Sequence, residues 1–288
     1  MKAFYLIDKP IGFTSFDVLR KLKKHLNIRK MGHTGTLDPL ATGALLVAVG
    51  DYTKLIPYFE KDTKEYEFTI SLDGETDSFD SETDVRYISP AEQQKYKSEL
   101  TQDALEGMIE ENFTGDIEQV PPKYSALKIN GKKALDRVRA GEEFEMKKRA
   151  STISKIEILS YEYPNLTLRA TVTAGTYIRS IAHDLGEIVG TGGYITYLRR
   201  TKIGTLDIAK SQTLSEFDED QKMLFTDLFK NKTTITLKEE VLSKINNGLT
   251  VQLEDFPYQD GEYFVGNAHD ITNIVIYKKP ILKAKRKI

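Results

Sequence analysis

The chain has 288 residues, of which 40% are hydrophobic and 29% charged, and its formal net charge at pH 7 is −2. This length allows one large domain with a small appended module. No apolar run approaches the roughly 20 residues that span a bilayer, and the start of the chain is charged too soon for a signal peptide. The absence of cysteine excludes disulfides and thiolate catalysis and fits a reducing cytoplasm. The four histidines are scattered without HExxH spacing, so no metal site is expected.

The charged residues are segregated along the chain. Six basic residues without an acid lie between Arg20 and Lys30, and two further basic clusters cover 147–149 and 278–287. Acidic residues gather between Asp73 and Asp84. Segregated basic patches on a nearly neutral protein fit a polyanion bound on one face. Charge alone is equally consistent with a simpler explanation, in which the basic residues lie on solvated helix faces and in an irregular C-terminal tail.

The first half of the chain contains several recognisable elements. Residues 3–8 are predicted to form a short strand. Thr14 and Ser15 are candidate caps of a helix that continues to Leu26, because the apolar residues that follow have helical spacing. Residues 66–72 alternate between apolar and polar side chains, as in a half-buried strand. The acidic stretch to about Ser89 is predicted to be a loop, and residues 102–112 are predicted to be helical.

The second half begins with an irregular segment. Residues 120–149 contain Pro121-Pro122 and many basic residues, which indicates an excursion from the sheet. Strands are predicted at 152–161 and 166–173, and a helix from about Thr176 to a C-cap at Gly190. Beyond about residue 230 the pattern indicates short strands separated by glycine turns, a module near the size at which independent stability is marginal.

One segment stands out as a candidate site. Residues 30–43 contain three glycines, His33 and a single carboxylate, Asp38, and the predicted buried strand 44–49 follows at once. A glycine-rich loop anchored to a core strand is a rigid mount for one reactive side chain. Taken alone, Leu37-Asp38-Pro39 is more typical of an ordinary turn, because the residue before a proline is pushed out of the helical conformation.

Five further segments follow a familiar order around this loop: Lys9–Ser15, the strand of Tyr66, Pro121–Lys128, Gly175–Ser180 with Asp184–Gly186, and Leu198–Thr201. Together with the Asp38 loop, over about residues 4–206, they resemble the tRNA pseudouridine synthase B family. Its stand-alone bacterial enzymes isomerise uridine 55 in the TΨC loop of tRNA. Two departures are that the insert 132–141 lacks the tyrosine usual near Leu135, and that the C-terminal module is short for the family's PUA domain.

The resemblance implies an α+β fold with a mixed, mostly antiparallel central sheet, flanking helices and a cleft. Residues 1–230 would form the catalytic domain, with an RNA-binding insert at about 120–150, and residues 231–288 a small β-rich, PUA-like RNA-binding module. The isomerisation detaches the uracil, turns it and rejoins it through carbon, so neither cofactor nor metal is needed. The implied partner is the TΨC stem-loop of tRNA, bound by a cytoplasmic monomer without an obligate protein partner.

Three residues are expected to carry the chemistry. Asp38 is the predicted nucleophile; attack on the ribose C1′, attack on the uracil ring and proton abstraction all remain open. A carboxylate inside a dry pocket needs an opposing cation to stay ionised, and the resemblance assigns this role to Arg179. Its position alone would favour a surface arginine that reaches solvent or an RNA phosphate. Tyr66 would stack on the displaced uracil, with an ordinary core tyrosine as the alternative.

The remaining expected site residues bind the nucleotide or the RNA backbone. Tyr177 and Leu198 would line the pocket, and His33 would brace the RNA where the flipped nucleotide left. Lys9 would contact the substrate or support its own loop. Candidates for phosphate contacts, chosen by clustering, are Arg20, Lys21, Lys24, Lys128, Lys132, Arg149, Arg199 and Arg200.

Two other functions fit the same residues. One is a non-catalytic RNA-binding or RNA-folding protein on the same scaffold, for which Asp38 would be dispensable. The other is the guide-RNA-dependent branch of the family, which works inside a ribonucleoprotein. The continuous insert and the short C-terminal tail favour the stand-alone branch.

Overall fold

The body of the protein is one mixed sheet. The computed structural model describes residues 1–59, 61–230 and 232–288. Neighbouring strands of the sheet pair antiparallel except for β1 with β14 and β3 with β12, which are parallel. The mixed, mostly antiparallel sheet expected from the sequence is therefore confirmed. Its strands, in spatial order, are β14 (Gln212–Thr213), β1 (Ala3–Lys9), β3 (Thr42–Val49), β12 (Tyr194–Ile203), β4 (Lys64–Ser71), β11 (Asn165–Val172), β10 (Arg149–Glu162) and β7 (Gly115–Gln119), with β2 (Met31–His33) beside β3 and β13 (Leu206–Asp207) beside β12.

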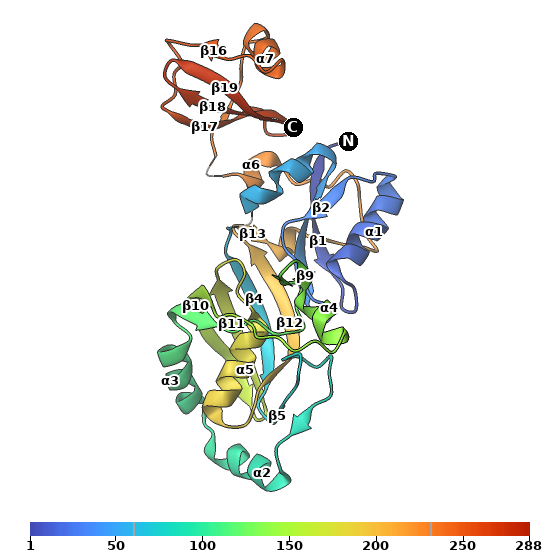
Figure 1. Ribbon diagram of the computed structural model, residues 1–288, viewed down its shortest axis with the longest axis vertical. Coiled ribbons are helices and arrows are strands. Elements are labelled where there is room, and N and C mark those ends of the chain that lie inside the picture. The colour runs from blue at the N-terminus through green and yellow to red at the C-terminus, as the bar shows by residue number, and fades with distance from the viewer. Residues whose placement is uncertain (60, 231) are drawn as a thin grey trace.

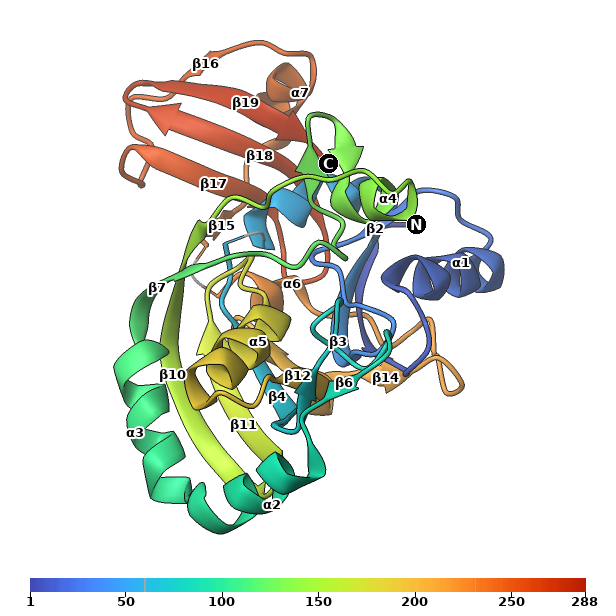
Figure 2. The ribbon, with the colours of Figure 1, turned by 60° about the horizontal axis from the view of Figure 1, so that its bottom comes forward.

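Helices cover the sheet and surround its ends (Figures 1 and 2). Helix α5 packs against β12, and α3 packs against both β10 and α5. The apolar side chains of α1, α3 and α5 share one core cluster with the inner residues of β1, β3, β4 and β11. Their bounds are α1 (Ser15–Leu26), the 3-10 helix η1 (Gly50–Phe59), α2 (Pro90–Glu99), α3 (Gln102–Asn112), α4 (Ala134–Arg139), α5 (Ile178–Val189) and the 3-10 helix η2 (Ile208–Lys210).

Helix α1 shows how the sequence specifies a local element. Thr14 is its N-cap and forms a capping box with Asp17, in which each side chain accepts a hydrogen bond from the other's backbone N–H. The capping box satisfies donors that the first turn would leave unpaired. Val18, Leu19 and Leu22 are buried, as their spacing predicts. On the opposite face Arg20, Lys21 and Lys24 are exposed.

Two segments leave the sheet and carry short elements of their own. Residues 72–113 form β5 (Gly74–Glu75), β6 (Arg86–Tyr87), α2 and α3. The insert that follows β7 contains β8 (Lys128–Ile129), β9 (Lys132–Lys133) and α4. Figure 2 shows this insert, in green, running from β7 toward the part of the sheet that carries β2.

The C-terminal region has a sheet of its own but shares a core with the body. The sheet has the order β15 (Thr234–Ile235), β17 (Gly261–Gly266), β18 (Ile271–Lys278), β19 (Ile281–Lys287) and β16 (Val251–Gln252). Helix α7 (Glu239–Asn246) lies within this region, where the sequence indicated only strands, and α6 (Phe225–Leu228) precedes it. Phe225, Phe229 and Phe264 belong to the same buried cluster as Phe4 and Phe59 of the body. Across the described residues, no helix is long and apolar enough to cross a membrane.

Helix α5 is seated by a close backbone contact at Gly186. A Cβ atom built on Gly186 would lie 2.1 Å from the carbonyl carbon of Gly192. No side chain fits at that distance, so the glycine lets the helix approach the turn that leads into β12. This contact matters for function because α5 and β12 both contribute residues to the cavity described below.

Replacing Gly186 by alanine is therefore expected to lower the free energy of unfolding by about 1–3 kcal/mol, because the new methyl group must displace backbone. Gly107→Ala in α3 is the matched control, since a Cβ there meets nothing within 4 Å. That control should raise the free energy of unfolding by about 0.5–1 kcal/mol. Urea denaturation of both variants measures the two changes; equal changes would contradict the close-packing argument.

Candidate active site

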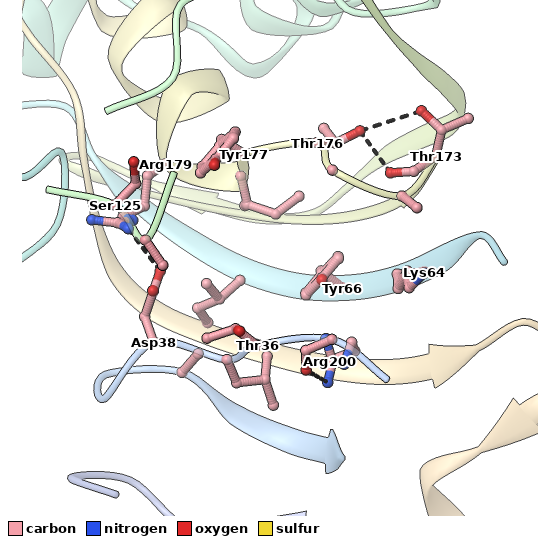
Figure 3. A pocket seen from close by; sticks show the side chains of 18 of the residues that line it. Thr36, Asp38, Lys64, Tyr66, Ser125, Thr173, Thr176, Tyr177, Arg179 and Arg200 are labelled. Carbon is pink, nitrogen blue, oxygen red and sulfur yellow. Dashed lines mark hydrogen bonds and ion pairs between the residues drawn. The ribbon is translucent and has the colours of Figure 1, made fainter. Parts of the chain in front are cut away.

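A cavity of about 410 Å³ opens beside the central strands, a volume within the range of ligand pockets. Five parts of the chain form its wall: the loop after β2, strand β4, strand β12, the insert, and the turn between β11 and α5 (Figure 3). The lining residues include Thr34–Asp38, Lys64, Tyr66, Ser125–Leu127, Thr173–Arg179, Leu198 and Arg200. Of the six predicted motif segments, five therefore contribute residues to one cavity, whereas Lys9–Ser15 does not line it.

Asp38 and Arg179 form an ion pair in this cavity. Nη2 of Arg179 lies 2.9 Å from Oδ2 of Asp38, and the side chains are 6% and 37% exposed, respectively. The carboxylate thus retains an open side, whereas the guanidinium is buried. Arg179 occupies the first turn of α5, and Asp38 lies in the glycine-rich loop before β3. The structure brings together the two residues that the family resemblance paired.

A second carboxylate, Asp80, holds Arg179 from the other side. Nη1 of Arg179 lies 3.1 Å from Oδ2 of Asp80, whose side chain is fully buried. The same guanidinium donates hydrogen bonds to the carbonyl oxygens of Ser78 and Tyr124, both at 3.0 Å. Asp80 is itself positioned by Ser78, whose hydroxyl donates to Oδ1 at 2.6 Å. Arg179 therefore has one orientation, which is set by three different segments.

The sequence analysis missed Asp80, because it sits in the acidic stretch that reads as a solvated loop. It also missed Gln119 at the end of β7. The side chain of Gln119 accepts a hydrogen bond from the backbone N–H of Tyr177 (3.1 Å) and donates to the Tyr177 carbonyl (3.2 Å). Gln119 thereby fixes the backbone just before α5. Its place two residues before the proline pair Pro121-Pro122 was the only signal in the sequence.

The predicted pocket residues lie in the wall as follows. Tyr66 of β4 and Tyr177 are partly buried, Leu198 of β12 is buried, and all three line the cavity. His33 precedes the lining segment. Burial, with a smaller contribution from Arg200, lowers the pKa of His33, which favours a neutral ring. Its Nδ1 is buried and has no hydrogen-bond partner among the described residues.

Lys9 lies behind the Asp38 loop and is fully buried. Its ammonium group donates hydrogen bonds to the carbonyl oxygens of Pro10, Phe13 and Pro39. These three contacts join the 10–13 turn to the residue after Asp38. Of the two expected roles, this position favours loop support over substrate contact. Burial, opposed in part by Asp38, lowers the pKa of Lys9 to about 8.

The predicted backbone-binding residues fall into two groups. Arg20, Lys21 and Lys24 on α1 are exposed, as are Lys128, Lys132 and Arg149 in and beside the insert. Arg199 is paired with Asp8. Arg200 differs from the expectation, because it is only 1% exposed and donates to the carbonyl oxygens of Ala44 and Gly35. It braces the Asp38 loop from inside the cavity wall.

One group of side chains outside the cavity has metal-ligand character. Ligand atoms of Glu75, His183 and Glu187 lie within 4.8 Å of one another. Glu75 is paired with Arg86 at 3.2 Å, and the ring of His183 stacks on Phe79 with the centroids 4.0 Å apart. These other contacts explain the positions of Glu75 and His183 without an ion.

Comparison with known proteins identifies the family. Residues 23–178 match the model of the TruB family pseudouridylate synthase N-terminal domain. Residues 179–241 match that of the tRNA pseudouridylate synthase B C-terminal domain. The first match alone covers more than half of the chain. The chain belongs to the TruB family. The family resemblance stated on sequence motifs is thus confirmed.

Relatives and solved structures agree with this assignment. The tRNA pseudouridine synthase B of Clostridium kluyveri is 35% identical and is matched over 92% of this chain and 94% of its own length. That of Aquifex aeolicus is 34% identical over 90% of each chain. A Cbf5-Nop10-Gar1 complex contains a chain with the same fold, with a TM-score of 0.69, 21% identity, and coverage of 99% of this chain and 84% of that one.

The lowered pKa of Lys9 predicts a pH dependence of stability. The folded protein releases this proton near pH 8, whereas an ordinary lysine holds it to about 10.5. The unfolded chain therefore binds more protons over this interval, so the native state gains stability as the pH rises. We expect the free energy of unfolding, relative to that of Lys9→Met, to increase between pH 8 and 10, by at most about 1.4 kcal/mol per pH unit.

Urea unfolding at a series of pH values measures this difference. Comparison with Lys9→Met cancels the titration of groups that both proteins share. A difference that stays constant from pH 8 to 10 would mean that Lys9 titrates equally in the folded and unfolded states.

Proposed function

We propose that this protein isomerises uridine 55 in the TΨC loop of tRNA to pseudouridine, as a stand-alone monomer. Its membership of the TruB family and the relatives named tRNA pseudouridine synthase B support this function. The observation that carries it is the Asp38–Arg179 pair, which presents a half-open carboxylate to a nucleotide-sized cavity.

The reaction breaks the bond between ribose C1′ and uracil N1 and forms a bond between C1′ and C5. The proton on C5 leaves, N1 gains a proton, and nothing is oxidised or reduced. A base inside a folded loop is out of reach of the carboxylate, so the nucleotide must first flip out of its stack. The cavity offers the flipped base the aromatic face of Tyr66, the ring of Tyr177 and the apolar side chain of Leu198.

Asp38 acts on the sugar–base linkage, and Arg179 orients its carboxylate. The guanidinium lies 2.9 Å from Oδ2 of Asp38, the distance of a charge-assisted hydrogen bond. Because Asp80 and two carbonyl oxygens bind the rest of the guanidinium, Arg179 cannot swing out to the RNA. Its role is therefore positioning and charge balance for Asp38.

The RNA backbone binds the exposed basic groups around the cavity. Helix α1 and the insert present basic side chains on two sides of the Asp38 loop, and their contacts with phosphates account for affinity. The catalytic body comprises residues 1–230, and the β-rich module of residues 231–288 provides a PUA-like second contact with the tRNA. No guide RNA or partner protein is required.

Replacement of Asp38 by asparagine tests the function directly. The change keeps the size of the side chain but removes the charge and the nucleophile, so we expect pseudouridine formation to fall by more than about 10³-fold. The measurement is the mapping of pseudouridine in an unmodified transcript of tRNA after incubation with purified protein. The exposed Asp84 supplies the matched control, because Asp84→Asn should leave activity unchanged.

The same assay separates the alternatives. A wild-type protein that forms no pseudouridine without added components would point to a guide-dependent assembly. A wild-type protein that binds and refolds the transcript without modifying it would be a non-catalytic RNA-binding protein. Modification at a uridine other than 55 would contradict the proposed position.

Arg179→Ala tests whether this arginine serves catalysis or RNA binding. We expect turnover to fall by at least about 10²-fold, because Asp38 loses its charge partner, while the Kd for tRNA changes by less than about threefold. The variant also leaves Asp80 buried without a partner, so circular dichroism should accompany the kinetics. Parallel losses of turnover and affinity would instead identify a phosphate contact.

A further inference from the structure

Two hydroxyl groups in the wall of the cavity have no hydrogen-bond partner. They are Oγ of Ser125 and Oγ1 of Thr34, both buried from solvent and both unpaired among the described residues. The residues are only 5% and 7% exposed. Nearly all buried polar groups in folded proteins are paired, so an unpaired group calls for an explanation. In a substrate cavity, the simplest explanation is a bond that forms only when the substrate arrives.

Ser125 lies at the end of the cavity where the chemistry takes place. Figure 3 shows it at the same end as Asp38 and Arg179, whereas Lys64 and Arg200 occupy the other end. The preceding residue, Tyr124, accepts a hydrogen bond from Arg179 at 3.0 Å. The Ser125 carbonyl accepts one from the N–H of Leu135 at 3.1 Å. Ser125 thus lies between Arg179 and helix α4 of the insert, and its hydroxyl has no partner among the described residues.

Thr34 belongs to the other end of the cavity. It precedes Gly35, whose carbonyl accepts a hydrogen bond from the Arg200 guanidinium at 3.1 Å. Its own backbone N–H donates to the Leu46 carbonyl. The residues that carry the two unpaired hydroxyls therefore line different parts of the cavity.

The chemistry at the Asp38 end identifies the group that Ser125 meets. The proposed reaction breaks and remakes bonds at C1′ of the target nucleotide, so the carboxylate of Asp38 must reach the neighbourhood of this carbon. The polar substituent closest to C1′ is the 2′-hydroxyl on the next carbon of the ring. This hydroxyl both donates and accepts, as does that of a serine, and it distinguishes RNA from DNA at a given site.

We propose that Ser125 binds the 2′-hydroxyl of the target uridine and makes the site selective for a ribonucleotide. This inference rests on the proposed function and adds a specificity-determining residue to it. The N–H of Leu135 in α4 donates a hydrogen bond to the Ser125 carbonyl. The contact between Ser125 and the 2′-hydroxyl would therefore couple the position of the insert to binding of the nucleotide.

A cycle of four dissociation constants tests the contact. The proteins are Asp38→Asn and the double variant Asp38→Asn/Ser125→Ala, so that no turnover disturbs the equilibrium. The ligands are TΨC stem-loop RNAs with either uridine or 2′-deoxyuridine at the target position. We expect Ser125→Ala to weaken binding of the uridine RNA by about 3- to 10-fold and to leave binding of the 2′-deoxyuridine RNA unchanged.

Thr34→Val in the same background is the matched control, since it removes the other unpaired hydroxyl of the cavity. It should change binding of both RNAs by the same factor. If Ser125→Ala weakens both RNAs equally, or neither, Ser125 does not bind the 2′-hydroxyl and the assignment is wrong. This failure differs from failure of the proposed function, in which the wild-type protein would form no pseudouridine in transcript tRNA.

Discussion

The site depends on one buried guanidinium shared by two carboxylates. Arg179 enters from α5, Asp80 from the excursion after β4, and Asp38 from the loop before β3. Without Arg179, the carboxylates of Asp38 and Asp80 would repel each other. Without the two carboxylates, the buried guanidinium would be an uncompensated charge. Because the arginine is held by Asp80 and by two carbonyl groups, Asp38 meets a cation that is already in place. Three distant parts of the chain must therefore fold correctly before the carboxylate of Asp38 is held in position.

Much of this arrangement could be predicted from the sequence, because several elements carry strong local signals. Helix α1 has a capping box and a regular apolar stripe, and β4 alternates cleanly around Tyr66. The loop of Asp38 is marked by three glycines before a buried strand. The motif order then supplied the pairing of Asp38 with Arg179, which no local pattern contains.

The elements that escaped prediction are those whose character comes from tertiary contacts. Strand β12 is central in the sheet, yet Arg199 and Arg200 interrupt its apolar pattern, since one pairs with Asp8 and the other braces the Asp38 loop. Asp80 reads as one more acid in a solvated stretch because nothing nearby in the sequence reveals that Arg179 neutralises it. The burial of a charged residue can be predicted from the sequence only when its oppositely charged partner is also known.

The aromatic cluster between the body and the C-terminal sheet has a geometric consequence for the RNA. Phe225, Phe229 and Phe264 pack with Phe4 and Phe59, and Arg286 near the end of β19 donates to the carbonyl of Lys54 in η1. A module held in this way keeps a constant separation from the cavity that contains Asp38. The second tRNA contact proposed for this module would therefore lie at a fixed distance from the target base. A stem-loop alone would occupy only the cavity, whereas a full L-shaped tRNA would also reach the module.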